Sequence, residues 1–469
     1  MSAQLYQATF IGDQKLSAQL ERGALEAADP RRVSEILNKA ALAGGLSVDE
    51  AAALIQLEDP ELKAELYRVA GEVKKNIYGQ RIVLFAPLYI SDYCVNNCRY
   101  CGYQHSSPQA RRRLTMAEIA DETLAILAMG HKRVALEQGE DPAHNPIDYV
   151  IEALETIYAQ SYRGSNIRRA NVNIAATTVE NYRRLKQAGI GTYVLFQETY
   201  HRGTYEKVHR GPKADYERQL YAMHRAMEGG VDDVGLGALF GLYNWRFDTL
   251  AMLTHAEALE RDTGVGPHTF SIPRIRAAAG VDLNLFADPV SDEDFKKLTA
   301  VLRLTAPYAG MLLSTRESVD MRRELLEVGV SQISAGSRTG VGGYTFPLKG
   351  EKEQKPQFQV EDTRDALEVI RQLVDMGYWP SFCTACYRQG RTGDRFMKLA
   401  KTGHIQHICG PNALLTFQEF IRDFGDEGLK QSGGALIGKA LDEIDNPRLR
   451  KVTTEKLSAI EEGGFDLYL

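Results

Sequence analysis

The 469-residue chain has only six cysteines, and none lies outside two short groups. No segment resembling an export signal precedes them, which argues against disulfides, since these form in oxidising compartments. The sequence lacks an apolar stretch of about 18 residues, the length needed to span a bilayer, so we expect no membrane association. The net charge of −6 gives no electrostatic basis for nucleic-acid binding. These absences together predict a cytoplasmic protein with free thiols.

The first cysteine group, Cys94, Cys98 and Cys101, lies in the loop SDYCVNNCRYCGYQHSS. The loop directly follows an apolar run at residues 82–90, so the three thiolates can converge at a strand end. Thiolates bind both zinc and iron–sulfur clusters. Structural zinc takes four ligands, usually from paired C-x2-C motifs, so three cysteines favour a [4Fe-4S] cluster with one open iron. A zinc site that includes His105, or disulfides, are the alternatives.

The second group, Cys383, Cys386 and Cys409, lies far downstream, in FCTACYRQGRTGDRFM and HICGPNALLTFQEF. It also supplies three thiolates, and no cysteine remains to complete a fourth ligand at either group. We therefore expect a second iron–sulfur cluster near the end of the chain.

Between the two groups, β-rich apolar runs alternate with amphipathic segments. Several of these segments end in glycine, and Gly130, Gly189 and Gly329 are predicted to adopt the left-handed conformation that closes a helix. Apolar strands that alternate with helices indicate a parallel sheet covered on both faces. Eight such runs favour an α/β fold of the (β/α)8 TIM-barrel type over an open sheet. The expected strands are residues 82–90, 132–140, 170–176, 192–199, 233–242, 268–275, 311–317 and 331–337.

Three parts of the chain are expected. Residues 1–80 predict a helical collar, in which Asp29 caps a helix that begins with Pro30. Residues 81–349 form the barrel. A polar, breaker-rich run after Gly350 indicates a linker, and residues 350–469 are expected to form a helical domain that carries the second cluster.

The carboxyl ends of the expected strands carry polar side chains. In barrels of this kind the working residues gather at that end, so we expect these side chains to share one mouth. They are Gln138, Gly139, Glu140, Gln197, Glu198, Thr199, Arg274, Arg276, Thr315, Arg316, Glu317, Ser337 and Arg338.

The spacing C-x3-C-x2-C, with the aromatic Tyr100 before the third cysteine, resembles the signature of the radical S-adenosylmethionine (SAM) superfamily. The resemblance implies that the open iron chelates SAM and that the reduced cluster cleaves it to a 5'-deoxyadenosyl radical. It also implies that the backbone at Gly139 and Glu140, which match the last two positions of a GGE-type motif, binds the SAM amino group. We expect Arg218 to pair with the SAM carboxylate, with a surface ion pair as the alternative, and Glu198 to bind the ribose hydroxyls.

The resemblance extends over the whole chain. The C-terminal triplet C-x2-C-x22-C and the segments EQGEDP, QETYH, PHTFSIPR, STRE and SAGSRTGVGGY resemble the HydG group of tyrosine lyases. The related ThiH group, which makes dehydroglycine for thiazole synthesis, resembles the barrel but lacks the triplet. A HydG-like function implies cleavage of the Cα–Cβ bond of L-tyrosine to p-cresol and dehydroglycine. The second cluster, with an additional iron and a free L-cysteine, then yields iron-bound carbon monoxide and cyanide for the [FeFe]-hydrogenase.

The same resemblance implies that His268, in the PHTFSIPR segment, binds the additional iron. His268 precedes its expected strand, so we expect a short strand with residues 268–276 looping over the mouth. The implied partners are the hydrogenase maturation proteins HydE and HydF and an electron donor, flavodoxin or ferredoxin.

The tyrosine carboxylate requires a cation near the mouth, for which the candidates are Arg274, Arg276, Arg316 and Arg338. Because Arg316 and Arg338 end consecutive strands, with Ser337 beside the latter, we expect this pair to share one anion. Two other classes of protein remain as alternatives: a cluster scaffold and a two-cluster electron-transfer protein. A polar barrel mouth and a chain of this length favour an enzyme over both.

Overall fold

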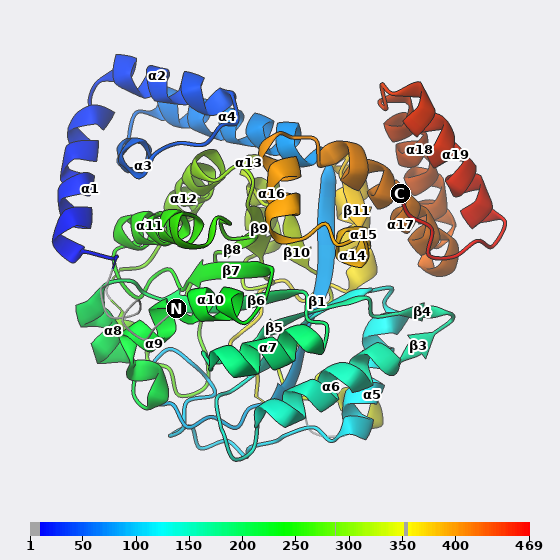
Figure 1. Ribbon diagram of the computed structural model, residues 1–469, viewed down its shortest axis with the longest axis horizontal. Coiled ribbons are helices and arrows are strands. Elements are labelled where there is room, and N and C mark those ends of the chain that lie inside the picture. Colours follow the sequence, from blue (N-terminus) through cyan, green and yellow to red (C-terminus); the bar gives the residue numbers. More distant parts are fainter. Residues whose placement is uncertain (1–9, 287, 351–354) are drawn as a thin grey trace.

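In the computed structural model, which describes residues 10–286, 288–350 and 355–469, eight parallel strands close into a barrel (Figure 1). The sheet order is β10-β9-β8-β7-β6-β5-β2-β1, and pairing of β10 with β1 closes it. All eight expected strands are present, so the (β/α)8 prediction is confirmed. Their bounds are β1 Arg81–Ser91, β2 Arg133–Gln138, β5 Arg169–Asn173, β6 Thr192–Glu198, β7 Asp233–Ala238, β8 Thr269–Ser271, β9 Gly310–Leu313 and β10 Gln332–Ser334.

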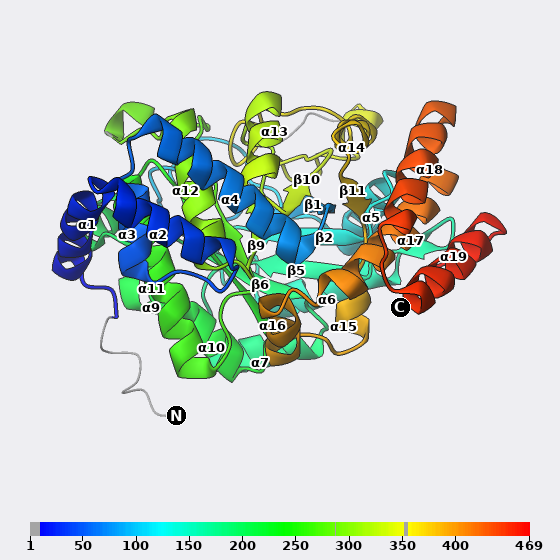
Figure 2. The same ribbon diagram turned by 90° about the horizontal axis from the view of Figure 1, so that it is seen from above.

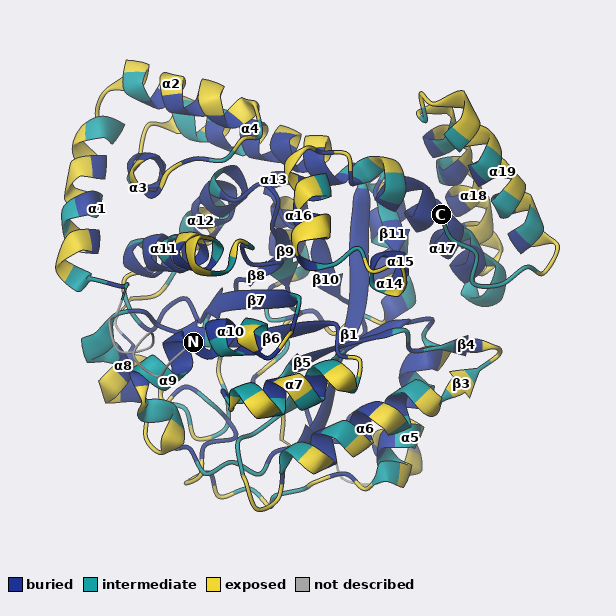
Figure 3. Ribbon diagram, viewed as in Figure 1, coloured by how far each residue is buried: buried dark blue, intermediate teal, exposed yellow. Residues whose placement is uncertain are grey.

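Helices cover the outside of the barrel, with buried inner faces and exposed outer faces (Figure 3). A small hairpin of β3 (Ser161–Tyr162) and β4 (Ser165–Asn166) projects at one side. The covering helices are α5 Met116–Ala128, α6 Ile147–Ala159, α7 Val179–Gln187, α8 Arg202–Val208, α9 Tyr216–Leu220, α10 Ala222–Glu228, α11 Trp245–Thr263, α12 Asp292–Thr305, α13 Val319–Val328 and α14 Ala366–Asp375. No helix among the described residues combines the length and apolar character of a membrane span.

Glycines close two of these helices as predicted. Gly130 and Gly189 have φ angles of +86° and +80°, in the left-handed region. The prediction for Gly329 is wrong, because its φ of −174° is extended. A side chain there would place its Cβ 3.1 Å from the Cβ of Arg303, so glycine at this position makes room for the contact between α12 and α13.

Four helices precede the barrel: α1 Asp13–Ala27, α2 Pro30–Ala41, α3 Val48–Ile55 and α4 Pro60–Tyr78. Asp29 caps α2, since its carboxylate accepts a hydrogen bond from the Arg31 amide at 2.9 Å, with Pro30 at the first helical position. In Figure 2, α4 lies across α12 and α13, where it packs on the barrel.

The C-terminal part packs on an edge that the sequence pattern did not predict. The short strand β11 (Trp379–Ser381) pairs with Arg81–Val83 at the beginning of β1. It is followed by α15 Ala385–Arg388, α16 Gly393–Lys401, α17 Gln406–Phe424, α18 Glu427–Asp442 and α19 Pro447–Glu461. A buried ion pair between Lys132 and Glu419 joins α17 to the barrel. Removal of either side chain would leave the other as an uncompensated buried charge in the docked position.

One buried carboxyl group makes the stability of the fold depend on pH. Asp248 on α11 is inaccessible to solvent, and one of its oxygens accepts hydrogen bonds from the Thr199 hydroxyl at 3.0 Å and the Tyr200 amide at 2.8 Å. Its other oxygen has no partner among the described residues. Burial therefore raises the pKa of Asp248 to about 7.

Between about pH 4 and pH 7 the unfolded chain has lost this proton while the folded chain keeps it, so stability falls as pH rises. The full effect above pH 7 is about 4 kcal/mol. Asp248→Asn, which cannot ionise, is expected to flatten the pH dependence of the unfolding free energy, measured by anaerobic denaturant titration of the cluster-loaded protein. The exposed Asp445→Asn serves as control. Parallel curves for Asp248→Asn and the unaltered protein would contradict the assignment.

Candidate active site

The first cysteine loop leaves the carboxyl end of β1 and is fixed by backbone hydrogen bonds to its neighbours. The Val95 amide donates to the Glu140 carbonyl at 2.7 Å, and the Arg99 amide donates to the Val208 carbonyl at 3.0 Å. A Cβ at Gly139 would lie 2.4 Å from the Tyr93 carbonyl oxygen, so only glycine permits this close contact between the loop and the end of β2.

A pocket at this mouth contains all three thiols of the loop. Its lining includes four of the five residues expected at the SAM site, Tyr100, Gly139, Glu140 and Glu198. The Tyr100 hydroxyl is hydrogen-bonded to His209 Nε2 at 2.8 Å. The fifth residue, Arg218, does not line the pocket.

Arg218 pairs with Glu140 at 2.6 Å and donates to the Ala176 carbonyl at 2.5 Å. It therefore fixes the carboxylate of Glu140, whose other oxygen accepts a hydrogen bond from Asn96 Nδ2 at 2.6 Å. The structure places Arg218 behind Glu140, and its expected direct contact with a SAM carboxylate stays a prediction.

The sequence pattern did not identify Lys213, which lies on a short 3-10 helix, Pro212–Ala214. Its Nζ is 2.6 Å from Glu198 Oε1, and both residues line the thiol pocket. Burial opposes the charge of Lys213, but Glu198 and Cys98 outweigh this effect and raise its pKa. Glu198 itself has a φ of +70°, a strained value for a residue with a side chain. Lys213 follows Gly211 and Pro212 and is far from any strand, so the pattern of polar residues at strand ends does not indicate it.

The first three thiols fit a cluster by their environment. Burial raises the pKa of Cys94 and Cys98, and that of Cys101 to about 11. A thiolate here thus needs a nearby cation, which iron supplies on binding. Among the described residues no three His, Cys, Asp or Glu side chains are arranged around a single metal ion. In a cubane each protein thiolate binds a different iron, so such convergence is not required.

Inside the barrel, a second pocket lies against the first. The two share the residues Glu137, Asn173, Phe196, Arg316, Gln357 and Phe358. The guanidinium of Arg316 stacks on the Phe358 ring at 3.3 Å, and burial lowers the pKa of Arg316. Burial also raises the pKa of Glu137 to about 8, although Arg316 opposes this shift. The interior pocket therefore carries a buried cation next to a carboxyl group that keeps its proton at neutral pH.

The other predicted arginines lie in different surroundings. Arg274 pairs with Asp292 at 2.7 Å and with the fully buried Glu317, and Arg276 pairs with the same Glu317 at 2.8 Å. These carboxylates already neutralise both arginines.

Arg338 is exposed and lines an outer cavity, whereas Arg316 lies inside the barrel. The structure therefore does not bring Arg316 and Arg338 together around one anion. Ser337 is buried and lines both the interior pocket and the outer cavity.

The second cysteine group lies at the opposite, amino end of the barrel. Cys383, Cys386 and Cys409 line a pocket there, together with His268. The strand β8 is short, as expected, but the expectation that residues 268–276 loop over the mouth with His268 is wrong. His268 precedes its strand because its site lies at the amino ends of the strands.

Three buried arginines, Arg81, Arg133 and Arg169, line the same pocket. Arg133 donates to the Cys383 carbonyl at 2.9 Å. A hydrogen bond from Cys409 and the nearby Arg391 lower the pKa of Cys386 to about 6. Burial raises the pKa of Cys383, and the hydrogen bond with Cys386 together with burial raises that of Cys409, while the charge of Arg81 opposes both shifts.

His268 has a carboxylate beside it. Its Nδ1 lies 3.5 Å from Asp233 Oδ1, and the same oxygen accepts a hydrogen bond from the Gly393 amide at 3.0 Å. Burial and the nearby arginines hold the pKa of His268 well below its usual range. A neutral imidazole with a carboxylate at one nitrogen is typical of metal-binding histidines.

The interior pocket and the amino-end pocket are successive layers of one barrel. Three strands each contribute one residue to the amino-end pocket and the residue two positions later to the interior pocket. These pairs are Val83 and Phe85 on β1, Arg169 and Asn171 on β5, and Gln332 and Ser334 on β10. Side chains two positions apart on a strand point to the same side. The two linings therefore continue one another along the barrel axis.

Comparisons with known proteins agree with this arrangement. The radical SAM superfamily model matches residues 88–253, and the biotin and thiamin synthesis associated domain matches residues 271–379. The chain is 31% identical to the 2-iminoacetate synthase of Escherichia coli K12, over 73% of this chain and 89% of the relative.

Two solved structures resemble nearly the whole chain. One is the crystal structure of HydG, described as a maturase of the [FeFe]-hydrogenase, with a TM-score of 0.94, 53% identity and coverage of 98% of this chain and 100% of that one. The other is the maturase HydG from Carboxydothermus hydrogenoformans, with a TM-score of 0.81, 38% identity and coverage of 95% and 100%. A radical SAM domain carries a SAM-binding [4Fe-4S] cluster, which the thiols at the barrel mouth fit. The chain belongs to the radical SAM superfamily and, within it, to the HydG family.

Proposed function

We propose that this enzyme cleaves the Cα–Cβ bond of L-tyrosine to p-cresol and dehydroglycine, and converts dehydroglycine to iron-bound carbon monoxide and cyanide. The observation that carries the proposal is the position of the two thiol groups at opposite ends of one barrel, with a lined interior between them. A fragment made at the mouth can then react at the amino end without entering solvent. We also propose that residues 1–80, 81–349 and 350–469 are the collar, the barrel and the domain that carries the second cluster.

At the mouth, Cys94, Cys98 and Cys101 hold the first cluster. With SAM bound, this group supplies a 5'-deoxyadenosyl radical. The backbone at Gly139 and Glu140 and the carboxylate of Glu198 bind SAM, and Tyr100 packs beside the cluster. Lys213, paired with Glu198 at 2.6 Å, balances the negative charge of the thiolates. Arg218 holds Glu140 in position.

In the interior pocket, Arg316 binds the carboxylate of tyrosine and Ser337 lies beside the amino acid. The hydroxyl of Ser337 is buried and has no partner among the described residues, so it is available to a ligand. Glu137 keeps its proton near neutral pH and does not repel the carboxylate. Arg274, another candidate, is instead paired with Glu317, and Arg338, which we expected to share the anion with Arg316, lines the outer cavity.

At the amino end, Cys383, Cys386 and Cys409 hold the second cluster, and His268 binds an additional iron with a free L-cysteine. The buried arginines attract the carboxylate of dehydroglycine from the interior pocket. The product is destined for the [FeFe]-hydrogenase, in concert with HydE and HydF, and a flavodoxin or ferredoxin supplies electrons. The two similar solved structures are described as [FeFe]-hydrogenase maturases, which supports this role.

A second function, release of dehydroglycine as in 2-iminoacetate synthase, is favoured by the 31% identity to that enzyme. The match covers 89% of the relative but only 73% of this chain. The remaining length of this chain and its second thiol group support the longer reaction. Trapping of carbon monoxide by deoxymyoglobin distinguishes the two functions.

Arg316→Gln is expected to raise the KM for tyrosine about a hundredfold, because losing a charge-assisted hydrogen bond to a buried carboxylate costs about 3 kcal/mol. Both clusters should remain intact. Chromatography of p-cresol against tyrosine concentration measures the effect, and the exposed Arg323→Gln is the matched control. An unchanged KM would exclude Arg316 as the carboxylate ligand.

Cys386→Ala is expected to spare p-cresol and to abolish carbon monoxide, because only the amino-end site loses a ligand. Cys98→Ala should abolish both products. Parallel assays of p-cresol and of deoxymyoglobin carbonylation measure the split. Continued carbon monoxide production by Cys386→Ala would refute the division of the reaction between two sites.

Asp233→Asn is expected to weaken binding of the additional iron about tenfold to a hundredfold, because the carboxylate orients His268. The electron paramagnetic resonance signal of the second site should change, while p-cresol formation stays at its normal rate. The exposed Asp445→Asn is the control. If Asp233→Asn keeps the normal signal and iron content, Asp233 does not position His268.

A further inference from the structure

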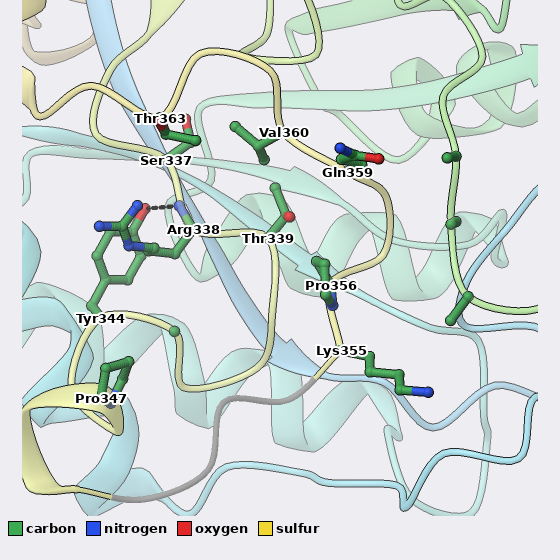
Figure 4. A pocket seen from close by; sticks show the side chains of 14 residues that line it. Ser337, Arg338, Thr339, Tyr344, Pro347, Lys355, Pro356, Gln359, Val360 and Thr363 are labelled. Carbon is green, nitrogen blue, oxygen red and sulfur yellow. Dashed lines mark hydrogen bonds between the residues drawn. The ribbon is translucent and has the colours of Figure 1, made fainter.

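A cavity of about 680 Å³ lies on the outer side of the barrel mouth (Figure 4). Three segments line it: residues 277–279 after β8, residues 337–347 after β10, and residues 355–363. Figure 4 shows the side chains of Arg338 and Lys355 at this cavity, and both are exposed. None of the described residues that line it is acidic, and its two exposed cations favour an anion.

Residues 355–360, here named the strap, separate this cavity from the interior of the barrel. The Gln357 amide donates to the Thr339 carbonyl at 3.0 Å, and the Gln359 amide donates to the Ala277 carbonyl at 2.8 Å. The strap is thus attached on both sides of the mouth. Gln357 and Phe358 line the interior pocket, while Pro356 and Gln359 line the outer cavity.

The two spaces meet at Ser337 and Thr339, which belong to both linings. Both side chains are almost completely buried, with exposures of 3% and 4%. The Thr339 hydroxyl donates to the Phe358 carbonyl at 3.2 Å, which ties the strap to this boundary. Two hydroxyl-bearing side chains therefore form the boundary that the interior pocket and the outer cavity share.

With SAM and the second cluster bound as proposed above, the other two sides of the interior pocket are occupied. Toward the first cysteine loop it shares Arg316, Glu137 and Phe358 with the pocket that SAM occupies. Toward the amino end it continues into the site of the second thiol group. A substrate that reaches the SAM-loaded enzyme therefore needs a third route.

We propose that the outer cavity is the entrance for the amino-acid substrate and the exit for its neutral phenolic product. The proposal rests on the function proposed above. Arg338 and Lys355 attract the substrate carboxylate at the surface, and Ser337 and Thr339 mark where it crosses into the interior. The carboxylate then moves from the exposed Arg338 to the buried Arg316, whose desolvated guanidinium binds it more strongly. Arg338 thus sets the rate of capture and takes no part in the chemistry.

The test uses the complete, cluster-loaded enzyme, with SAM bound before labelled L-tyrosine is added. Arg338→Gln is expected to lower kcat/KM for tyrosine about fivefold to tenfold at low ionic strength, with the deficit shrinking as salt is added. Ala278→Trp, which fills the cavity, should lower it more than tenfold. The KM for SAM and the cluster signals should not change. The matched controls are Arg323→Gln and Ala459→Trp, the latter in a remote surface hollow on α19.

Normal kcat/KM values for both cavity variants, or tyrosine binding that is blocked when SAM is bound first, would overturn the entrance. An equal loss in the remote tryptophan control would do the same, because it would show a general loss of structure. Failure of the proposed function gives a different result: the unaltered enzyme would form no p-cresol.

Discussion

Charge balance at buried thiolates is the constraint on which both ends of this barrel depend. A thiolate removed from water is stable only beside a cation. At the mouth, Lys213 reaches toward Cys98 from a turn, and its pKa is raised by Glu198 and the thiols. At the amino end, Arg81 is held charged because the thiols outweigh the effect of its burial. These cations favour the deprotonated form that iron requires.

Strand β1 connects the two ends. Its eleven residues rise about 3.3 Å each, so Arg81 and Ser91 lie roughly 33 Å apart along the strand. Alternate residues face the interior: Val83 lines the amino-end pocket, Phe85 the interior pocket, and Tyr89 the same pocket nearer the mouth. The unpredicted strand β11 pairs with the beginning of β1 and places Cys383 two residues after its own end. Anchoring of the C-terminal part to β1 therefore sets the separation between the two thiol groups.

The barrel could be predicted because β-rich segments alternate with amphipathic helices along the chain, a pattern that the sequence carries locally. The strand β11 could not, since three residues that include Pro380 do not form a recognisable strand without β1 beside them. The cysteine spacings indicated both thiol groups, and a GGE-type motif indicated Gly139 and Glu140. Lys213 and Asp233 act through contacts between distant segments, which no local pattern records. The four candidate arginines could not be distinguished by sequence, because their differences lie in their contacts. Arg274 and Arg276 form ion pairs with Glu317. Arg338 is exposed, and Arg316 is buried against the Phe358 ring.

The same distribution of arginines favours movement of a carboxylate from the outer cavity toward the amino end of the barrel. A carboxylate meets an exposed cation at the outer cavity, a buried one at Arg316, and three buried ones at the amino end. Electrostatic attraction strengthens as water is excluded, so each step holds the anion more firmly than the one before. Under the function proposed above, the neutral phenol has no such preference and is free to leave toward solvent. Cleavage of one zwitterionic substrate into a neutral and an anionic fragment would thus be enough to send the two fragments in opposite directions, without any moving part.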